Sequence, residues 1–332
     1  MIKLALLGFW HVHAKDYIRE SAENPDTEII AAWDDDETRG QEGAAAIGVP
    51  YYRSLDEILA LPDLDGVIVT TATTLHKDVI PAAARAVKHV FTEKVLGVTH
   101  DEARDIAAVL DSSGVTAVVA LRWVPTGAVR AALAAARSGR LGDLIEVRIR
   151  IAHDGALRSE QNPDGWLPVR FYDPAEAAGG LMIDLGAHPL YLTRLFLGMP
   201  ESLYATYGNI TGRASEDQAV VTMRYPSGAI GVAGTSAAGR APMLFEIFGT
   251  KGHIRWDGPG TPLMFFGGER DSAWEEITDV PEDEPTQFNQ FVALVKAGER
   301  NPENIALSVD LSALAAAANQ SAATDGPVRL AQ

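Results

Sequence analysis

The first third of the chain alternates between short apolar runs and longer segments with apolar residues at helical spacing. Runs without internal alternation are typical of parallel strands that are covered on both faces. The segments between them include predicted helices at 14–22, 78–86 and after residue 100, so this part predicts a parallel sheet flanked by helices. Ser54 and Thr99 each precede a Glu by three residues, which predicts capped helix starts. The apolar runs cover residues 2–7, 28–33, 66–69, 89–92 and 115–120.

The pattern changes near residue 122. Apolar and charged residues alternate strictly over 145–151 and again over 217–225, as in strands with one covered face. Short turns separate the strands, so we expect a mostly antiparallel sheet. A helix is expected at 127–138, a second after Thr286, and an alanine-rich one at 304–323. Further strands are predicted at 229–235, 243–248, 253–256 and 263–266.

These patterns predict an α/β protein with two domains. Residues 1–121 should form a doubly wound parallel sheet of the Rossmann type. Residues 122–332 should form a second α/β domain around the antiparallel sheet. A length of 332 residues and a hydrophobic content of 47% are enough for two such cores.

Composition narrows the functional classes. The formal net charge of −17 argues against nucleic acid or an anionic membrane as a partner, because both attract basic surfaces. The chain has no cysteine, which excludes disulfides and thiolate metal sites. It contains no apolar run of about 20 residues, and it begins with an apolar strand rather than a basic leader with a cleavage site. We therefore expect a cytoplasmic protein.

The turn after the first strand is a candidate nucleotide site. It reads Gly8-Phe-Trp-His-Val-His13 and leads into a helix, and the next strand ends at Asp34. Strand, glycine turn, helix, strand and terminal acid is the layout of a dinucleotide-binding unit. Pyrophosphate would bind the free N–H groups of the helix, and Asp34 would bind the ribose hydroxyls and repel a 2′-phosphate, which favours NAD over NADP. Only one of the three expected glycines is present, so an ordinary strand-to-helix turn is the alternative, with Asp34 as a loop-end acid.

The same turn contains two imidazoles. His11 and His13 are two residues apart and could share a divalent ion. No third ligand stands near them in the sequence, so we predict no metal site. A role facing phosphate or substrate is the favoured interpretation.

Polar residues also follow the later strands of the predicted parallel sheet. Thr71, Thr73 and His76 follow the third apolar run, and Glu93 and Lys94 follow the fourth. Ligands of open α/β sheets bind at the carboxyl ends of the strands, so these side chains are expected to face one crevice. The alternative for Glu93 and Lys94 is a pair of exposed surface charges.

A second cluster lies at residues 179–189. Asp184 and His188 are four residues apart after two glycines, so they should lie on one helical face. A carboxylate and an imidazole presented together can handle a proton. The alternative is a buried histidine that the aspartate satisfies.

Together these features resemble the glucose–fructose oxidoreductase / inositol dehydrogenase (Gfo/Idh/MocA) family over nearly the whole chain. The resemblance implies a Rossmann domain followed by an α/β domain with a large open sheet, which commonly forms a dimer or tetramer contact. The order and spacing of the motifs carry it: Gly8 with Asp34, Thr71-x-Thr73-x-x-His76, Glu93-Lys94, Arg122-Trp-x-Pro125, Asp173-x-x-x-x-Ala178-Gly-Gly180 and Asp184-x-Gly186-x-His188.

The resemblance also implies roles for individual residues. Lys94 corresponds to the active-site lysine of a Glu-Lys-Pro motif, and Asp184 and His188 correspond to the catalytic Asp and His. Two departures from the family pattern stand out, since Val95 replaces the proline after the lysine and the glycine turn keeps only its first glycine. The residues expected to bind the cofactor are Gly8, Phe9, Trp10, His11, Val12, Asp34, Thr71, Thr73, His76, Glu93, Lys94 and Arg122.

The implied reaction is hydride transfer between a nicotinamide and a secondary alcohol of a sugar, polyol or cyclitol. His188 would take the proton, Asp184 would orient it, and Lys94 would stabilise alkoxide charge. An acidic protein suits an uncharged polyol. The substrate wall is expected to comprise His153, Arg158 and Trp166 beside His188, although Trp166 could equally be a core residue. Two alternatives remain, an enzyme of this family that cycles NAD to cleave glycosidic bonds and a non-catalytic sugar or nucleotide sensor.

Overall fold

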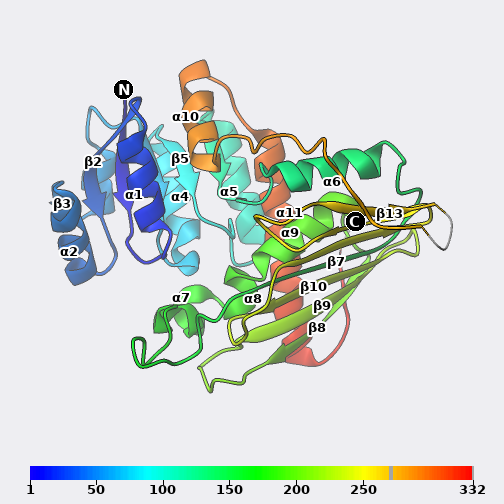
Figure 1. Cartoon of the computed structure of the whole chain (residues 1–332). Coiled ribbons are helices and arrows are strands. Elements are labelled where there is room, and N and C mark those ends of the chain that lie inside the picture. The colour runs from blue at the N-terminus through cyan, green and yellow to red at the C-terminus, as the bar shows by residue number, and fades with distance from the viewer. Residues whose placement is uncertain (269–271, 331–332) are drawn as a thin grey trace. The chain divides into compact units, whose positions relative to one another are not determined.

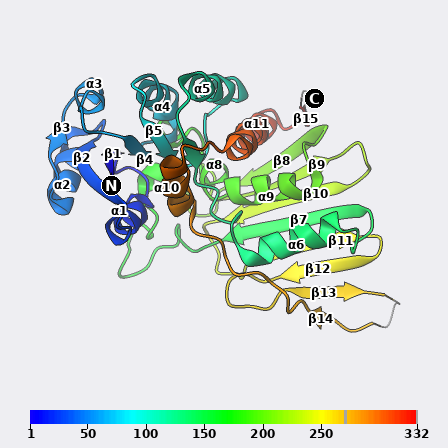
Figure 2. The ribbon, with the colours of Figure 1, turned by 90° about the horizontal axis from the view of Figure 1, so that it is seen from above.

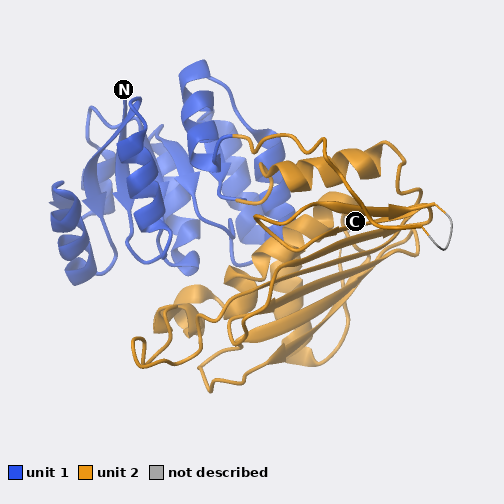
Figure 3. Ribbon diagram, in the orientation of Figure 1, with its two compact units in different colours: residues 1–121, 285–312 blue, residues 122–284, 313–332 orange. Residues whose placement is uncertain are grey.

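The computed structural model describes residues 1–268 and 272–330, and the chain divides into two compact units (Figure 3). Unit 1 contains residues 1–121 and 285–312, and unit 2 contains 122–284 and the chain from 313 onward. Residues 285–312 therefore differ from the predicted division, which placed them in the second domain. The sequence order of the elements did not reveal this return of the chain.

Unit 1 is built on a parallel sheet of six strands in the order β3-β2-β1-β4-β5-β6. This is the predicted Rossmann-type arrangement. The order of the strands reverses between β1 and β4, and such a switch point is where ligands of open α/β sheets bind. The strands are β1 (Ile2–Leu7), β2 (Thr27–Trp33), β3 (Tyr51–Tyr52), β4 (Gly66–Val69), β5 (His89–Thr92) and β6 (Ala117–Val119).

Helices flank this sheet (Figure 1). The two predicted caps are present, because the Ser54 and Thr99 side chains accept from the backbone N–H of Glu57 and Glu102. The sequence did not predict α2, which buries only Gly40 and Ala44 and so has almost no apolar periodicity. The helices are α1 (Ala14–Glu23), α2 (Glu37–Ile47), α3 (Leu55–Leu59), α4 (His76–Arg85), α5 (His100–Ser113), α10 (Gln287–Ala297) and the beginning of α11 (Pro302–Thr324).

An aromatic cluster explains why α10 belongs to unit 1. Phe91 on β5 makes edge-to-face contacts with Tyr17 at 4.8 Å and with Phe288 at 5.4 Å between ring centroids. The ring of Phe291 lies 5.8 Å from that of Phe91. Because Phe288 and Phe291 are almost completely buried, the apolar face of α10 completes this core.

Unit 2 is built on a sheet of nine strands in the order β14-β13-β12-β11-β7-β10-β9-β8-β15. Only β7 and β10 pair in parallel among these strands, so the sheet is mostly antiparallel, as predicted. The strands are β7 (Leu144–Ala152), β8 (Ser202–Gly208), β9 (Gln218–Arg224), β10 (Ile230–Ser236), β11 (Leu244–Gly249), β12 (Gly252–Trp256), β13 (Met264–Gly267), β14 (Glu275–Glu276) and β15 (Val328–Arg329).

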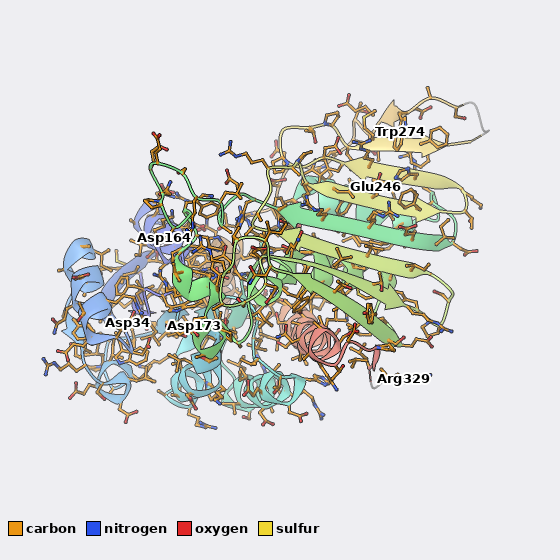
Figure 4. The ribbon with its side chains drawn as sticks, turned by 90° about the horizontal axis from the view of Figure 1, so that it is seen from below. Asp34, Asp164, Asp173, Glu246, Trp274 and Arg329 are labelled. Atoms are coloured by element: carbon orange, nitrogen blue, oxygen red, sulfur yellow. The ribbon has the colours of Figure 1, made fainter. Side chains whose placement is uncertain are left out.

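The two faces of this sheet differ. Val147, Ile149 and Ile151 of β7 are buried, and α9 packs against β7 and β10 on that side (Figure 2). Figure 4 shows the opposite face, which carries Glu246 and Trp274. The helices of unit 2 are α6 (Gly127–Arg137), α7 (Pro174–Ala177), α8 (Leu181–Asp184), α9 (Ala187–Leu197) and the rest of α11.

None of the helices in the described ranges combines the length and the apolar character that a bilayer crossing requires.

Candidate functional site

Gly8 brings the turn after β1 against the turn after β4. Its φ is +96°, and a Cβ at this position would lie 2.7 Å from the backbone nitrogen of Thr71. A side chain here would be both strained and in collision with backbone. The Gly8 N–H donates to the carbonyl of Trp33 at 2.7 Å, and the Thr70 hydroxyl donates to the Gly8 carbonyl at 2.5 Å. The switch point is therefore closely packed around this glycine.

The rest of the turn is largely buried. The His11 N–H donates to the carbonyl of Thr70 at 3.0 Å, and Trp10 is only 2% exposed. Val12 is partly buried. His13 is the N-cap of α1 but its side chain makes no capping hydrogen bond. The turn thus reaches the helix without the second and third glycines of the usual fingerprint.

Asp34 ties the end of β2 to the turn after β1. Its Oδ2 accepts from the Phe9 N–H at 2.6 Å, and both of its oxygens accept from the Arg39 guanidinium at 2.6 and 3.0 Å. The carboxylate is buried, so this charge-assisted pairing compensates its desolvation. Arg39 was not foreseen. The only sequence signal for it is a cation five positions after the acid.

The segment after β4 buries several polar side chains. Thr71, Thr73 and His76 are each no more than 6% exposed. His76 Nδ1 lies 2.8 Å from the Val95 carbonyl, so Nδ1 carries the hydrogen and Nε2 is an acceptor. Burial lowers the pKa of His76 to about 4, which keeps it neutral at pH 7. His76 Nε2 and Thr71 Oγ1 have no hydrogen-bond partner among the described residues. Buried polar atoms without a partner are uncommon, and a polar ligand would satisfy both.

Glu93 is buried in a hydrogen-bonded cluster rather than exposed on the surface. Its Oε1 accepts from the Tyr17 hydroxyl and lies 3.0 Å from His13 Nδ1, and its Oε2 accepts from the Lys94 N–H at 3.2 Å. Burial alone would raise the pKa of Glu93, but attraction to His11 and His13 and the His13 hydrogen bond hold that pKa well below its usual range. Tyr17 had no sequence signal, because it lies 76 positions from Glu93 along the chain.

Lys94 follows directly and is also buried, with 2% exposure. The Lys94–Val95 peptide bond is cis. An ammonium group this far removed from solvent interacts strongly with any charge beside it. The alternative that Glu93 and Lys94 are surface charges is therefore wrong.

In unit 2, Asp184 and His188 lie on two successive helices rather than one. Asp184 is the last residue of α8, and His188 is in the first turn of α9. Helical torsions continue through Leu185 and Gly186, but the Gly186 N–H donates to the carbonyl of Leu181, five residues earlier. A Cβ on Gly186 would lie 2.7 Å from the Met182 carbonyl oxygen, so the glycine permits this close turn.

Tyr191 orients the imidazole of His188. The His188 ring is 4% exposed, and its Nδ1 lies 3.2 Å from the Tyr191 hydroxyl. That hydroxyl oxygen accepts from the Trp123 N–H at 3.1 Å and can also accept from the Nδ1–H of His188, which leaves Nε2 of the neutral ring without a hydrogen. Nε2 is then the ring atom that would carry a transferred proton. Tyr191 was not predicted, although a tyrosine three residues after a histidine on a helix is a spacing that can bring the two side chains together.

Two of the expected substrate residues, His153 and Trp166, are in contact after the end of β7. The rings of His153 and Trp166 have centroids 4.6 Å apart. Asp154 accepts from the Trp166 indole at 2.9 Å and from the Arg240 guanidinium at 2.6 Å. Since the Trp166 side chain is 47% exposed, the core interpretation of this residue is wrong. Arg158 is exposed on the same loop.

Arg122 is the first residue of unit 2 and is exposed. Its guanidinium carbon lies 5.4 Å from the ring centroid of Trp123, a cation–π contact. The predicted residues of unit 1 lie at the carboxyl ends of β1, β2, β4 and β5. In unit 2, Asp184 and His188 lie on α8 and α9, the expected substrate residues follow β7, and Arg122 precedes α6.

Two family models cover most of the chain. Residues 2–121 match "Oxidoreductase family, NAD-binding Rossmann fold" of the GFO/IDH/MocA group, and residues 129–255 match the "GFO/IDH/MocA C-terminal domain".

Sequence relatives with named activities include sugar and cyclitol dehydrogenases, in agreement with the family models. A D-xylose 1-dehydrogenase (NADP(+)) of Haloferax volcanii is 32% identical over 58% of this chain, and the aligned part spans 57% of that protein. A scyllo-inositol 2-dehydrogenase (NAD(+)) of Bacillus subtilis is 27% identical over 76% of this chain and 72% of its own length. Among solved structures, a levoglucosan dehydrogenase in complex with NADH and L-sorbose has a TM-score of 0.84 at 19% identity, covering 100% of this chain and 99% of that one, which shows a shared fold.

Proposed function

The chain belongs to the Gfo/Idh/MocA oxidoreductase family, and we propose that it transfers a hydride between a secondary alcohol of a sugar, polyol or cyclitol and a nicotinamide dinucleotide. The observation that carries this proposal is Gly8, whose missing side chain lets the β1 turn approach Thr71 at the switch point of the sheet. The named activities of the relatives, on xylose and scyllo-inositol, support the substrate class.

The residues of unit 1 suit a dinucleotide. The turn from Gly8 to Val12 leads to the amino end of α1, where the helix dipole favours phosphate. The unpartnered Thr71 hydroxyl and His76 Nε2, with Thr73 beside them, offer polar contacts. Asp34 lies at the end of β2, where it would bind the ribose hydroxyls and repel a 2′-phosphate, so NAD is the proposed cofactor in preference to NADP. When bound, the nicotinamide would accept or donate the hydride.

The chain itself would handle the proton and the charge. The buried Lys94 would stabilise the negative charge that develops on the substrate oxygen. His188 would accept the alcohol proton at Nε2, since its Nδ1 faces Tyr191. Asp184 would steady the imidazolium. His153, Arg158 and Trp166 would line the substrate, with the exposed indole available to stack on a sugar ring.

The purified protein, assayed with a panel of polyols and aldoses, tests this proposal through NADH absorbance. Lys94→Ala and His188→Ala should each lower kcat by about 100-fold or more, because each removes a group that acts in the transition state. The affinity for NAD should change little in both variants.

Matched controls are Lys77→Ala and His100→Asn, which alter an exposed lysine and an exposed histidine outside the site. Near-normal turnover in both Lys94→Ala and His188→Ala would refute the catalytic assignment. Release of a free aglycone without net NADH would instead indicate the NAD-cycling cleavage reaction.

We also infer that the protein assembles as a homodimer or homotetramer through the sheet of unit 2. The face opposite α9 carries exposed apolar side chains on neighbouring strands, including Val220 at 48% and Ile230 at 50% exposure. A second copy packed on this face would cover both side chains.

A further inference from the structure

We propose that His11, His13 and Glu93 form a binding site for a divalent transition metal of the zinc class. His11 and His13 lie in the turn after β1, and Glu93 follows β5. Strands β1 and β5 both neighbour β4 in a parallel sheet, so their carboxyl ends meet at one edge. The fold thereby supplies the third ligand that the sequence around the two histidines lacks.

The distances suit a shared ion. The Oε1 of Glu93 lies 3.0 Å from His13 Nδ1 and 3.8 Å from His11 Nδ1. One donor atom from each residue lies within 4.8 Å of the other two. Zinc bonds of about 2.0–2.1 Å in a tetrahedral site place neighbouring ligand atoms about 3.3 Å apart. The two measured distances bracket that value, so small side-chain rotations would complete the site.

The surroundings would hold the ligands in place. Glu93 and His11 are no more than 4% exposed. The Tyr17 hydroxyl and the Lys94 N–H both donate to Glu93, and Tyr17 packs edge-to-face on Phe91. Such outer contacts orient the ligands of metal sites and raise their affinity.

The present hydrogen bonds are those that a metal would replace. A proton now lies between His13 Nδ1 and Glu93, and the His13 N–H donates to His11 Nδ1 at 3.2 Å. In the neutral ring of His13 the hydrogen would move from Nδ1 to Nε2, which makes the Nδ1 lone pair available to the ion. Two imidazoles and one carboxylate are a donor set that zinc and iron(II) accept, with a fourth position open to water.

The test uses the full chain, purified without a metal-affinity tag, treated with a chelator and titrated with Co²⁺. About one equivalent per chain should bind with the visible absorption of a low-symmetry site, and Zn²⁺ should displace it. His13→Asn and Glu93→Gln should each weaken Co²⁺ binding by more than about 100-fold, and Tyr17→Phe by about 10- to 100-fold as an outer contact. His100→Asn, on the exposed first residue of α5, should leave the affinity unchanged.

Thermal unfolding of each variant shows whether it is folded. If Glu93→Gln does not fold, His13→Asn alone tests the proposed metal site. The His13 side chain is 26% exposed, so its replacement should disturb the fold less. The proposal is overturned if the wild type binds no stoichiometric Co²⁺, or if folded His13→Asn binds it as well as His100→Asn does. Because the readout is metal binding, this result is independent of the oxidoreductase assay.

Discussion

Asp34 illustrates how one carboxylate serves both the fold and a proposed ligand. Its hydrogen bonds to the Phe9 N–H and to Arg39 join two loops at the edge of the sheet. The same charge would repel a 2′-phosphate, whereas the guanidinium of Arg39 would attract one. The cofactor preference therefore depends on which of these two charges faces the nucleotide.

Asp34→Ser should shift this preference toward NADP. The substitution removes the repulsive carboxylate and releases Arg39, so the ratio of kcat/KM for NADP to that for NAD should rise roughly tenfold or more, where each tenfold change corresponds to about 1.4 kcal/mol. Steady-state kinetics with both cofactors measure the ratio. Asp35→Ser is the control, since Asp35 also contacts Arg39 at 2.9 Å but has a more exposed side chain. An unchanged ratio in Asp34→Ser would mean that Asp34 does not set the preference.

At the level of elements, helix α10 is the clearest case of a segment whose role depends on long-range packing. The sequence predicted a helix after Thr286, and the structure shows Thr286 as its cap and the left-handed Gly298 at its end. The surface that α10 packs against was not predicted. The aromatic cluster around Phe91 places this helix with the first unit, although the helix lies far from Phe91 along the chain.

Phe291→Ala tests that assignment. Phe291 is fully buried against Phe91, so its truncation should lower the free energy of unfolding by about 3–5 kcal/mol. Lys296→Ala on the same helix removes an exposed ion pair with Asp26 and should cost no more than about 1 kcal/mol. Urea unfolding followed by circular dichroism compares the two. Equal losses would show that α10 contributes no core to the first unit.

For the whole molecule, the sheet face opposite α9 is the proposed association surface. Val220 and Ile230 have large exposed fractions on adjacent strands β9 and β10. Lysines at both positions would put like charges on the two copies of the surface, and burying them unpaired is unfavourable.

The double variant Val220→Lys, Ile230→Lys should therefore run as a single chain in light scattering, whereas the wild type should have the mass of a dimer or tetramer. Ile210→Lys is the control, because Ile210 is 68% exposed in the β8–β9 connection. A monomeric wild type, or a double variant with unchanged mass, would argue against this surface.

The sequence by itself determined much of this protein. Uniform apolar runs specified buried parallel strands, strict alternation specified a sheet with one covered face, and Ser54 and Thr99 marked helix starts. These features are local, because each depends on residues only a few positions apart in the sequence. For the same reason α2, which has almost no apolar periodicity, was missed. β8 was missed because an exposed position carries Tyr204, which obscures the alternation of apolar and polar residues.

Only the tertiary structure decided which distant side chains meet. Tyr17 and His13 reach Glu93 because parallel strands end at a common edge, and no spacing in the sequence encodes that edge. Likewise, α10 covers the surface around Phe91 because the rings of Phe288 and Phe291 fill the space beside it. The local pattern of residues determines whether a segment is a helix or a strand. Close packing between segments far apart in the sequence determines which residues that helix or strand contacts.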